Sequence, residues 1–299
     1  IAPAPSVSRN WTVPPKLGIL AGRGELPRRI VHAAQAAERP FFVIAFNGET
    51  EPDTVAPVFD HAGIDHAMVD HAWVDLPTVG RTIKLLKEAG VEELVMIGPV
   101  GRPDFAKMKP DWHGAKLLPK IIRAARKGDD ALMKVVVEDL ESQGFTILGA
   151  EDVLTSLGAP VGQFGTMGPD AGDRDDIARG MSVVAELGRL DIGQAAVVRD
   201  GYVLAVEAAE GTDRMLERCS QFRGANRGGV LVKRAKPDQE RRVDLPTIGV
   251  PTVAAAAAAG LKGIAVEAGG ALVADRAAVA VEADRLGIFV CGITLGEDR

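Results

Sequence analysis

The first half of the chain alternates short apolar runs with stretches of helical spacing. Lys16–Gly24 reads KLGILAGRG, a strand that runs into two glycines and is followed by a helix-forming segment. Phe41–Phe46 and Glu92–Ile97 are further apolar strands, and Leu76–Ala89 between them has apolar side chains at helical spacing. Strands that alternate with helices usually pair in parallel, with helices covering the sheet. We therefore predict a Rossmann-like parallel sheet for this half.

The second half begins at a stretch rich in Gly and Pro, Gly158–Gly172. Beyond it, the spacing predicts helices over Asp173–Leu187 and Arg276–Leu286, with short strands such as Tyr202–Val206 between them. A chain of 299 residues is long for a single core. We predict an α/β fold with two domains and a ligand between them: residues 16–157, residues 158–299, and a loose leader over residues 1–15.

Composition narrows the function. The formal net charge is -6 and aromatic residues make up 4%, which argues against both a basic nucleic-acid footprint and a base-stacking platform. The two cysteines, Cys219 and Cys291, fit neither a metal-binding pattern nor a disulfide framework. No stretch is apolar for long enough to span a bilayer. We expect a cytoplasmic protein, with peripheral contact to a membrane left open.

Ligands of parallel α/β sheets bind at the carboxyl ends of the strands. Here those ends include the turn Gly22–Leu26 and the turn that begins at Gly98. The first turn lacks the third glycine of a dinucleotide fingerprint, so we do not expect a nicotinamide cofactor. Its backbone N–H groups either meet a phosphate or ribose or form a tight turn with no ligand.

Charged residues follow two apolar runs in the second half. Three acidic residues follow the run Val203–Val206, and three cations, including Lys233 and Lys236, follow the run Gly229–Val232. Strand ends with opposite charges suit a metal and a phosphate held together. The alternative is a set of solvated strand ends.

A third cluster of charge is helical. Gly114–Lys127 places five cations mostly on one face of a helix. Such a face is usually solvated, and it also suits a phosphate or an anionic lipid surface.

The string GGVLVKRAKPDQERRVDLPTIG at Gly228–Gly249 is specific. With VLAVEAAEGTD at Val203–Asp213 and LGILAGRGELP near the start, it resembles the UDP-2,3-diacylglucosamine pyrophosphatases of the LpxI class. That resemblance implies a Gram-negative lipid A enzyme that uses Mg²⁺. It would hydrolyse UDP-2,3-diacylglucosamine, a lipid-linked nucleotide sugar, to UMP and 2,3-diacylglucosamine 1-phosphate (lipid X). The alternative is a non-catalytic protein that binds a nucleotide sugar or lipid.

The resemblance also suggests roles for individual residues. Acidic residues would hold the metal and activate water: Glu207 and Asp213 as metal ligands, Glu210 and Asp213 as catalytic groups. The remaining candidates would bind the substrate. The nucleotide would contact Gly22, Arg23, Gly24, Leu26 and Gly98, the diphosphate would contact Lys233 and Lys236, and the sugar or acyl amides would contact Gln163 and Thr166. Asp244 would act as a metal ligand, a base or a structural cap. The two acyl chains need an apolar groove, which either Gly158–Met167 or Val253–Ala259 could line.

Ala225 is a suspected departure from the family pattern, which we expect to carry an acid at this position. If an acid is missing from a loop next to the site, the protein would be an impaired form that holds its substrate uncleaved. Natural variation in a loop is the other interpretation. The sequence leaves oligomeric state open, with a homo-oligomer as one option.

Overall fold

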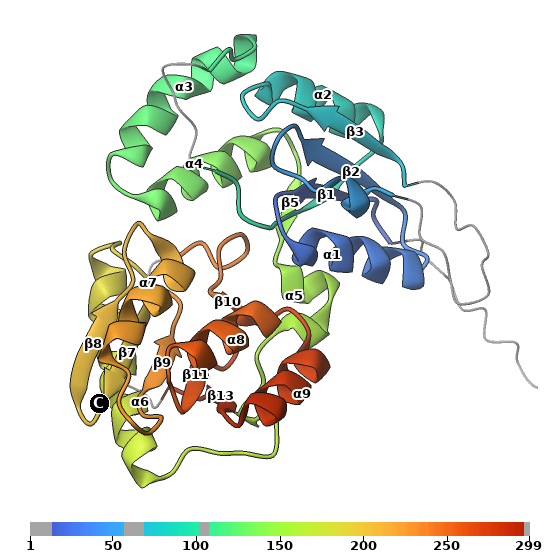
Figure 1. The fold of residues 1–299 in the computed structure, drawn as a ribbon. Coiled ribbons are helices and arrows are strands. Elements are labelled where there is room, and N and C mark those ends of the chain that lie inside the picture. Colours follow the sequence, from blue (N-terminus) through green and yellow to red (C-terminus); the bar gives the residue numbers. More distant parts are fainter. Residues whose placement is uncertain (1–13, 57–68, 102–107, 238, 296–299) are drawn as a thin grey trace, which may run out of the picture.

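The computed structural model describes residues 14–56, 69–101, 108–237 and 239–295. Two β-sheets with flanking helices follow one another along the chain (Figure 1). The expected α/β architecture with two sheets is confirmed. The predicted leader lies outside the described residues except for its last two positions.

The first sheet has the strand order β3-β2-β1-β4-β5, and every pairing is parallel. Its order reverses between β1 and β4, the place where such sheets bind ligands. The strands are β1 (Leu17–Ala21), β2 (Phe41–Phe46), β3 (His71–Val74), β4 (Glu93–Ile97) and β5 (Thr146–Leu148). The helices are α1 (Glu25–Ala36), α2 (Val79–Glu88), α3 (Trp112–Ala125), α4 (Asp129–Ser142) and α5 (Ala150–Val153).

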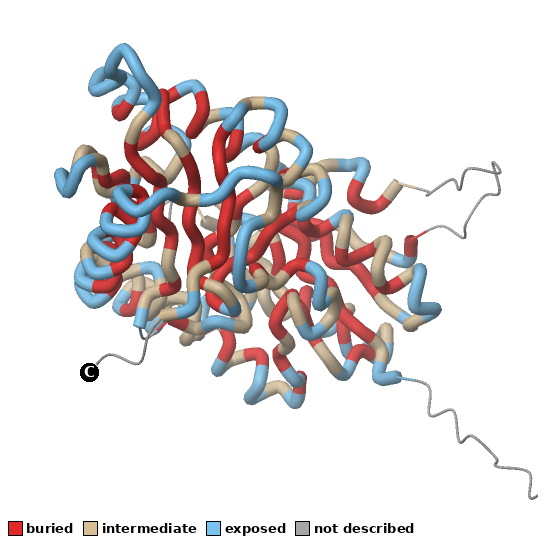
Figure 2. The backbone as a smooth tube through the Cα atoms, turned by 90° about the horizontal axis from the view of Figure 1, so that it is seen from below, coloured by how far each residue is buried: buried red, intermediate tan, exposed pale blue. Residues whose placement is uncertain are grey.

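Strand residues of the first sheet are buried on both faces, as expected for a parallel sheet between helices. Ile19 packs into the cluster formed with α1, whereas the next residue, Leu20, packs into the cluster that contains α2 and α4 residues. In Figure 2 the buried residues gather along the strands, and the outward faces of the helices are exposed. A continuous apolar run such as FFVIAF is therefore needed in β2.

The second sheet is mixed and has the order β6-β13-β11-β9-β7-β8. β9, β11 and β13 are parallel, whereas β6, β7 and β8 pair antiparallel to their neighbours. The strands are β6 (Gly162–Gln163), β7 (Ala195–Arg199), β8 (Tyr202–Val206), β9 (Val230–Lys233), β11 (Gly263–Glu267) and β13 (Phe289–Ile293). A separate parallel pair joins β10 (Thr247–Ile248) to β12 (Leu272–Val273).

Helices cover both faces of the second sheet: α6 (Ala171–Arg189) on one face, and α7 (Gly211–Cys219), α8 (Val250–Ala258) and α9 (Arg276–Leu286) on the other. Val253 is fully buried in this core, whereas Pro251, Ala254 and Ala258 leave one face of the Ala-rich α8 exposed. Both cysteines are buried and unpaired. Among the described residues, no helix has the length and apolar character needed to cross a bilayer.

The two halves contact each other at several places. Leu157 belongs to the core of the first sheet and Ala159 to that of the second, so the chain passes between the cores there. Val243 and Leu245, from the loop before β10, pack against opposite faces of the first sheet. An ion pair joins Arg29 of α1 to Asp275 at the start of α9. The second half therefore lies against the first sheet.

Candidate functional site

The charged ends of the second sheet lie along one edge. Lys233 is the last residue of β9 and pairs with Ala195, the first residue of β7. Glu207 directly follows β8, and Glu267 is the last residue of β11. Because β7 is antiparallel to β8 and β9, all of these residues meet at the same end of the sheet. The loop that follows Lys233 carries this edge toward the first half of the molecule.

Lys233 lies in a buried polar network. Its ammonium group donates to the Thr212 hydroxyl at 3.0 Å and to the Thr247 carbonyl oxygen at 3.0 Å. The Thr212 hydroxyl in turn donates to Glu207 at 2.7 Å, and the other Glu207 oxygen accepts from the Gln194 backbone N–H at 3.1 Å. Each Glu207 carboxylate oxygen therefore already accepts a hydrogen bond from another residue of the protein.

Three carboxylates act electrostatically on the Lys233 ammonium group. Burial lowers the pKa of Lys233 from its usual value, while the negative charges of Glu207, Asp213 and Asp244 act in the opposite direction. Asp213, in the first turn of α7, is exposed, and its carboxylate makes no hydrogen bond or ion pair within the described part of the chain. The arrangement is a buried cation with one open carboxylate beside it.

The loop after Lys233 is fixed by its own side chains. Lys236 forms an ion pair with Asp191, and its backbone N–H donates to the Gln239 side chain at 2.8 Å. The Gln239 amide donates to Asp244 at 2.6 Å and to the Gln194 side chain at 3.3 Å. The specific KP-x-Q string therefore shapes a loop that presents Asp244.

Asp244 lies where the two halves meet. Burial raises the pKa of Asp244; the Gln239 hydrogen bond and Lys236 oppose this, and Asp130 and Asp129 of α4 add to it. The same loop binds α4 directly, because the Glu240 backbone N–H donates to Asp130 at 2.9 Å. A carboxyl group with a raised pKa at a domain junction is a candidate for proton transfer.

Glu267 and Arg241 are members of this edge that the sequence reasoning missed. Arg241 donates to Glu267 at 3.1 Å, and the Ala235 backbone N–H donates to the other Glu267 oxygen at 3.0 Å. A Cβ atom on Gly270 would lie 2.2 Å from the Glu267 carboxyl carbon, so the following turn must leave room for this side chain. The acid at the end of the predicted strand at Gly263–Val266 was the available signal.

The first sheet places Gly22 and Gly98 in direct contact. A Cβ atom on Gly22 would lie 2.2 Å from the Gly98 carbonyl oxygen, and one on Gly98 would lie 2.5 Å from the Arg23 oxygen. Arg23 forms an ion pair with Glu49 at 3.0 Å. The Gly24 N–H, at the start of α1, donates to Glu51 at 2.9 Å. Both turns are thus built for close backbone packing, and a carboxylate already caps α1.

Other predicted site residues lie away from Lys233. Leu26, in the first turn of α1, points into the core of the first half. Gln163 lies in β6, three strands from β9, which is about 14 Å at the usual strand spacing. Thr166 donates to Asp284 of α9 at 2.8 Å from both its N–H and its hydroxyl. The structure therefore does not bring Gln163 and Thr166 into the Lys233 network.

Two predicted catalytic positions also lie outside this network. Glu210 forms an ion pair with Arg218 at 2.7 Å, and that hydrogen bond holds the pKa of Glu210 below its usual value. Ala225 is exposed in the loop that leads into the first residue of β9, whereas Lys233 is the last residue of that strand. The expectation that this loop lies next to the charged edge is corrected: it lies at the opposite end of the strand.

The charged edge suits Mg²⁺ only if the substrate supplies part of its ligand set. Among the described residues, no group of three or more His, Cys, Asp or Glu side chains is placed to hold a metal ion. Mg²⁺ in phosphoryl-transfer sites commonly takes one or two carboxylates and completes its shell with phosphate and water. Asp213 suits that mode because its carboxylate is exposed, whereas both Glu207 oxygens are already bonded.

Comparison with known proteins identifies the family. Residues 16–157 match the LpxI N-terminal domain, and residues 160–291 match the LpxI C-terminal domain. The chain belongs to the LpxI family. A relative from Caulobacter vibrioides, UDP-2,3-diacylglucosamine pyrophosphatase LpxI, is 45% identical over 284 residues, which cover 93% of this chain and 97% of the relative. The LpxI match thus extends over both sheets and includes the charged edge with its loop.

Proposed function

We propose that this protein hydrolyses the diphosphate bond of UDP-2,3-diacylglucosamine, giving UMP and 2,3-diacylglucosamine 1-phosphate in lipid A synthesis. Support comes from membership of the LpxI family and from the pyrophosphatase activity for which the Caulobacter vibrioides relative is named. The loop from Lys233 to Thr247 supports a location for this activity, because it joins the charged edge of the second sheet to α4 of the first half. A diphosphate bound there would lie between the two halves.

Each charged group at this edge has a proposed role. Lys233 offsets negative charge that develops on the diphosphate oxygens, and the Lys236–Asp191 pair holds the loop in position. Asp244 accepts a proton from the attacking water, a role that its raised pKa favours because it makes the carboxylate more basic. Asp213 would hold Mg²⁺ together with the diphosphate, and a bound Mg²⁺ would supply further charge neutralisation.

The nucleotide would lie along the turns of the first sheet. Arg23 is about half exposed beside Gly24 and Gly101, at the point where the strand order reverses. Backbone groups and Arg23 there suit a base and ribose better than a phosphate, because Glu51 already binds the Gly24 N–H. Peripheral contact with a membrane belongs to the proposal because the substrate carries two acyl chains.

The test is incubation of the purified protein with UDP-2,3-diacylglucosamine and Mg²⁺ in ¹⁸O-labelled water, with mass analysis of both products. UMP and 2,3-diacylglucosamine 1-phosphate are expected, and the product that carries the label identifies the attacked phosphorus. Tight retention of intact substrate without products would favour the non-catalytic binding protein instead. Omission of Mg²⁺ tests the proposed metal requirement separately.

A further inference from the structure

Helix α3 carries a concentrated positive charge that the hydrolytic site does not use. Between Trp112 and Gly128 there are five Lys or Arg residues and no Asp or Glu, in a chain whose net charge is -6. None of the five forms an ion pair within the described part of the chain. All five side chains are exposed, so the stretch presents a local charge of +5 that no carboxylate of the described residues pairs with.

The charged residues share one side of the helix with an aromatic ring. At 100° per residue, Trp112, Lys116, Lys120 and Arg123 fall within an arc of about 80°. We call these four residues the basic face; all four are exposed. Trp112 is 78% exposed, and the Lys116 ammonium lies 5.0 Å from the centre of a Trp112 ring. An exposed Trp among cations is typical of surfaces that lie at a membrane interface.

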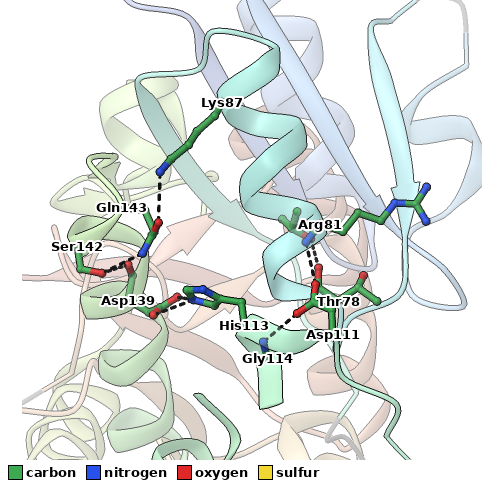
Figure 3. Close-up of polar contacts among 10 residues, drawn as sticks. Thr78, Arg81, Lys87, Asp111, His113, Gly114, Asp139, Ser142 and Gln143 are labelled. Carbon is green, nitrogen blue, oxygen red and sulfur yellow. Dashed lines mark hydrogen bonds and ion pairs between the residues drawn. The ribbon is translucent and has the colours of Figure 1, made fainter. Parts of the chain in front are cut away.

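Contacts on the other side of α3 hold the basic face outward. Asp111 caps the helix by accepting from the Gly114 N–H at 2.8 Å, and its other oxygen accepts from the Arg81 N–H of α2 at 2.8 Å. His113 lies 2.9 Å from Asp139 of α4 (Figure 3). Asp111 and His113, the two sequence neighbours of Trp112, are thus held by α2 and α4. The Trp112 side chain is therefore exposed on a helix end that is fixed in place.

From these observations we infer that the basic face docks on an anionic lipid surface. The inference rests on the proposed function, because a lipid substrate must be reached at a membrane. Unpaired cations are attracted to anionic headgroups, and the Trp112 ring would insert among them. A second copy of this chain is a poorer occupant, since two faces of like charge repel each other.

The experiment measures binding of the full chain to vesicles without substrate. Binding is expected to phosphatidylcholine vesicles that contain phosphatidylglycerol and not to pure phosphatidylcholine vesicles. Lys120→Gln/Arg123→Gln should weaken binding roughly 30-fold, while the charge-matched control Arg179→Gln/Arg189→Gln on α6 should not. Trp112→Ala should also weaken binding, whereas Tyr202→Ala, at a residue 75% exposed on β8, should leave it unchanged.

Several outcomes would overturn the inference: no binding to anionic vesicles, equal weakening by the control variants, equal binding to a DNA duplex, or self-association that Trp112→Ala abolishes. Hydrolysis of detergent-dispersed substrate by the same variants should be unchanged. That second measurement separates the two proposals, because vesicle binding requires no catalysis and dispersed substrate requires no membrane.

Discussion

The Lys233 ammonium lies 3.0 Å from the Thr247 carbonyl oxygen, which ties the end of β9 to the start of β10. Between these two residues runs the loop that carries Lys236, Gln239 and Asp244. The buried cation therefore closes the base of that loop. Substitutions of residues that hold the loop should therefore lower stability, whereas substitutions of residues that take part in the reaction should lower turnover alone.

Lys233→Met should lower both turnover and stability. We expect a loss of about 2 kcal/mol in the free energy of unfolding, because Thr212 and Thr247 lose a buried donor. Urea unfolding at neutral pH measures this loss. Lys84→Met, at an exposed residue paired with Glu88 on α2, is the control and should change stability by less than about 0.5 kcal/mol. Equal effects of the two substitutions would contradict the network.

Asp244→Asn should abolish most turnover without loss of stability. Removal of a general base typically costs about 10²- to 10⁴-fold in rate. Since burial raises the folded-state pKa of Asp244, wild-type stability falls as pH rises from the unfolded value through the raised value. The Asn variant lacks that fall and should be at least as stable at neutral pH. Full activity of the variant would remove Asp244 from catalysis; Asp284→Asn on α9 is a distant control.

Asp213→Asn should change the dependence on Mg²⁺ and spare folding, because the side chain is exposed. The Mg²⁺ concentration for half-maximal hydrolysis should rise by at least about tenfold, a scale seen even for partners outside the metal shell. Glu210→Gln is the matched control, since Glu210 is bound to Arg218. An unchanged Mg²⁺ titration in Asp213→Asn would exclude it as a ligand.

Ala225→Asp should leave turnover unchanged. Ala225 is exposed in the loop at the beginning of β9, whereas Lys233 ends the strand. Steady-state hydrolysis of dispersed substrate by the two proteins compares them directly. A large gain in turnover would instead support the interpretation of this chain as an impaired form.

Gly22→Ala should destabilise the first half by about 3 kcal/mol, because its Cβ would meet the Gly98 backbone at 2.2 Å and neither turn can move freely. Thermal unfolding provides the measurement. The same substitution at Gly172, in the exposed first turn of α6, meets nothing closer than 3.5 Å. There we expect a neutral or slightly stabilising effect, and a similar loss at both positions would contradict the close contact.

Periodicity was enough to predict the parallel first sheet, since runs such as Phe41–Phe46 are apolar at every position. It did not predict that β7 and β8 are antiparallel, because short apolar strands carry no signal of direction. The charged residues after β8 and β9 were expected at one edge, and Glu207 and Lys233 do meet there.

Other parts of the site depend on long-range contacts that no local pattern encodes. Asp244 and Asp130 are 114 positions apart in the sequence (244 − 130), and they influence each other only because the two halves pack together. Ala225 and Lys233 are close in sequence yet lie at opposite ends of one strand. Gln163 and Thr166 lie in a stretch rich in Gly and Pro, and such a composition fixes neither the neighbours of a side chain nor its direction.

The carboxylate of Glu51 at the start of α1 also bears on ligand selectivity. In many nucleotide-binding proteins a phosphate takes the N–H groups at this helix end. Here the Glu51 side chain already binds the Gly24 N–H, so the first half should discriminate against ligands anchored by a phosphate at the turn. A free nucleoside should then compete for the first half nearly as well as its monophosphate, while the full nucleotide sugar gains its affinity from the second half.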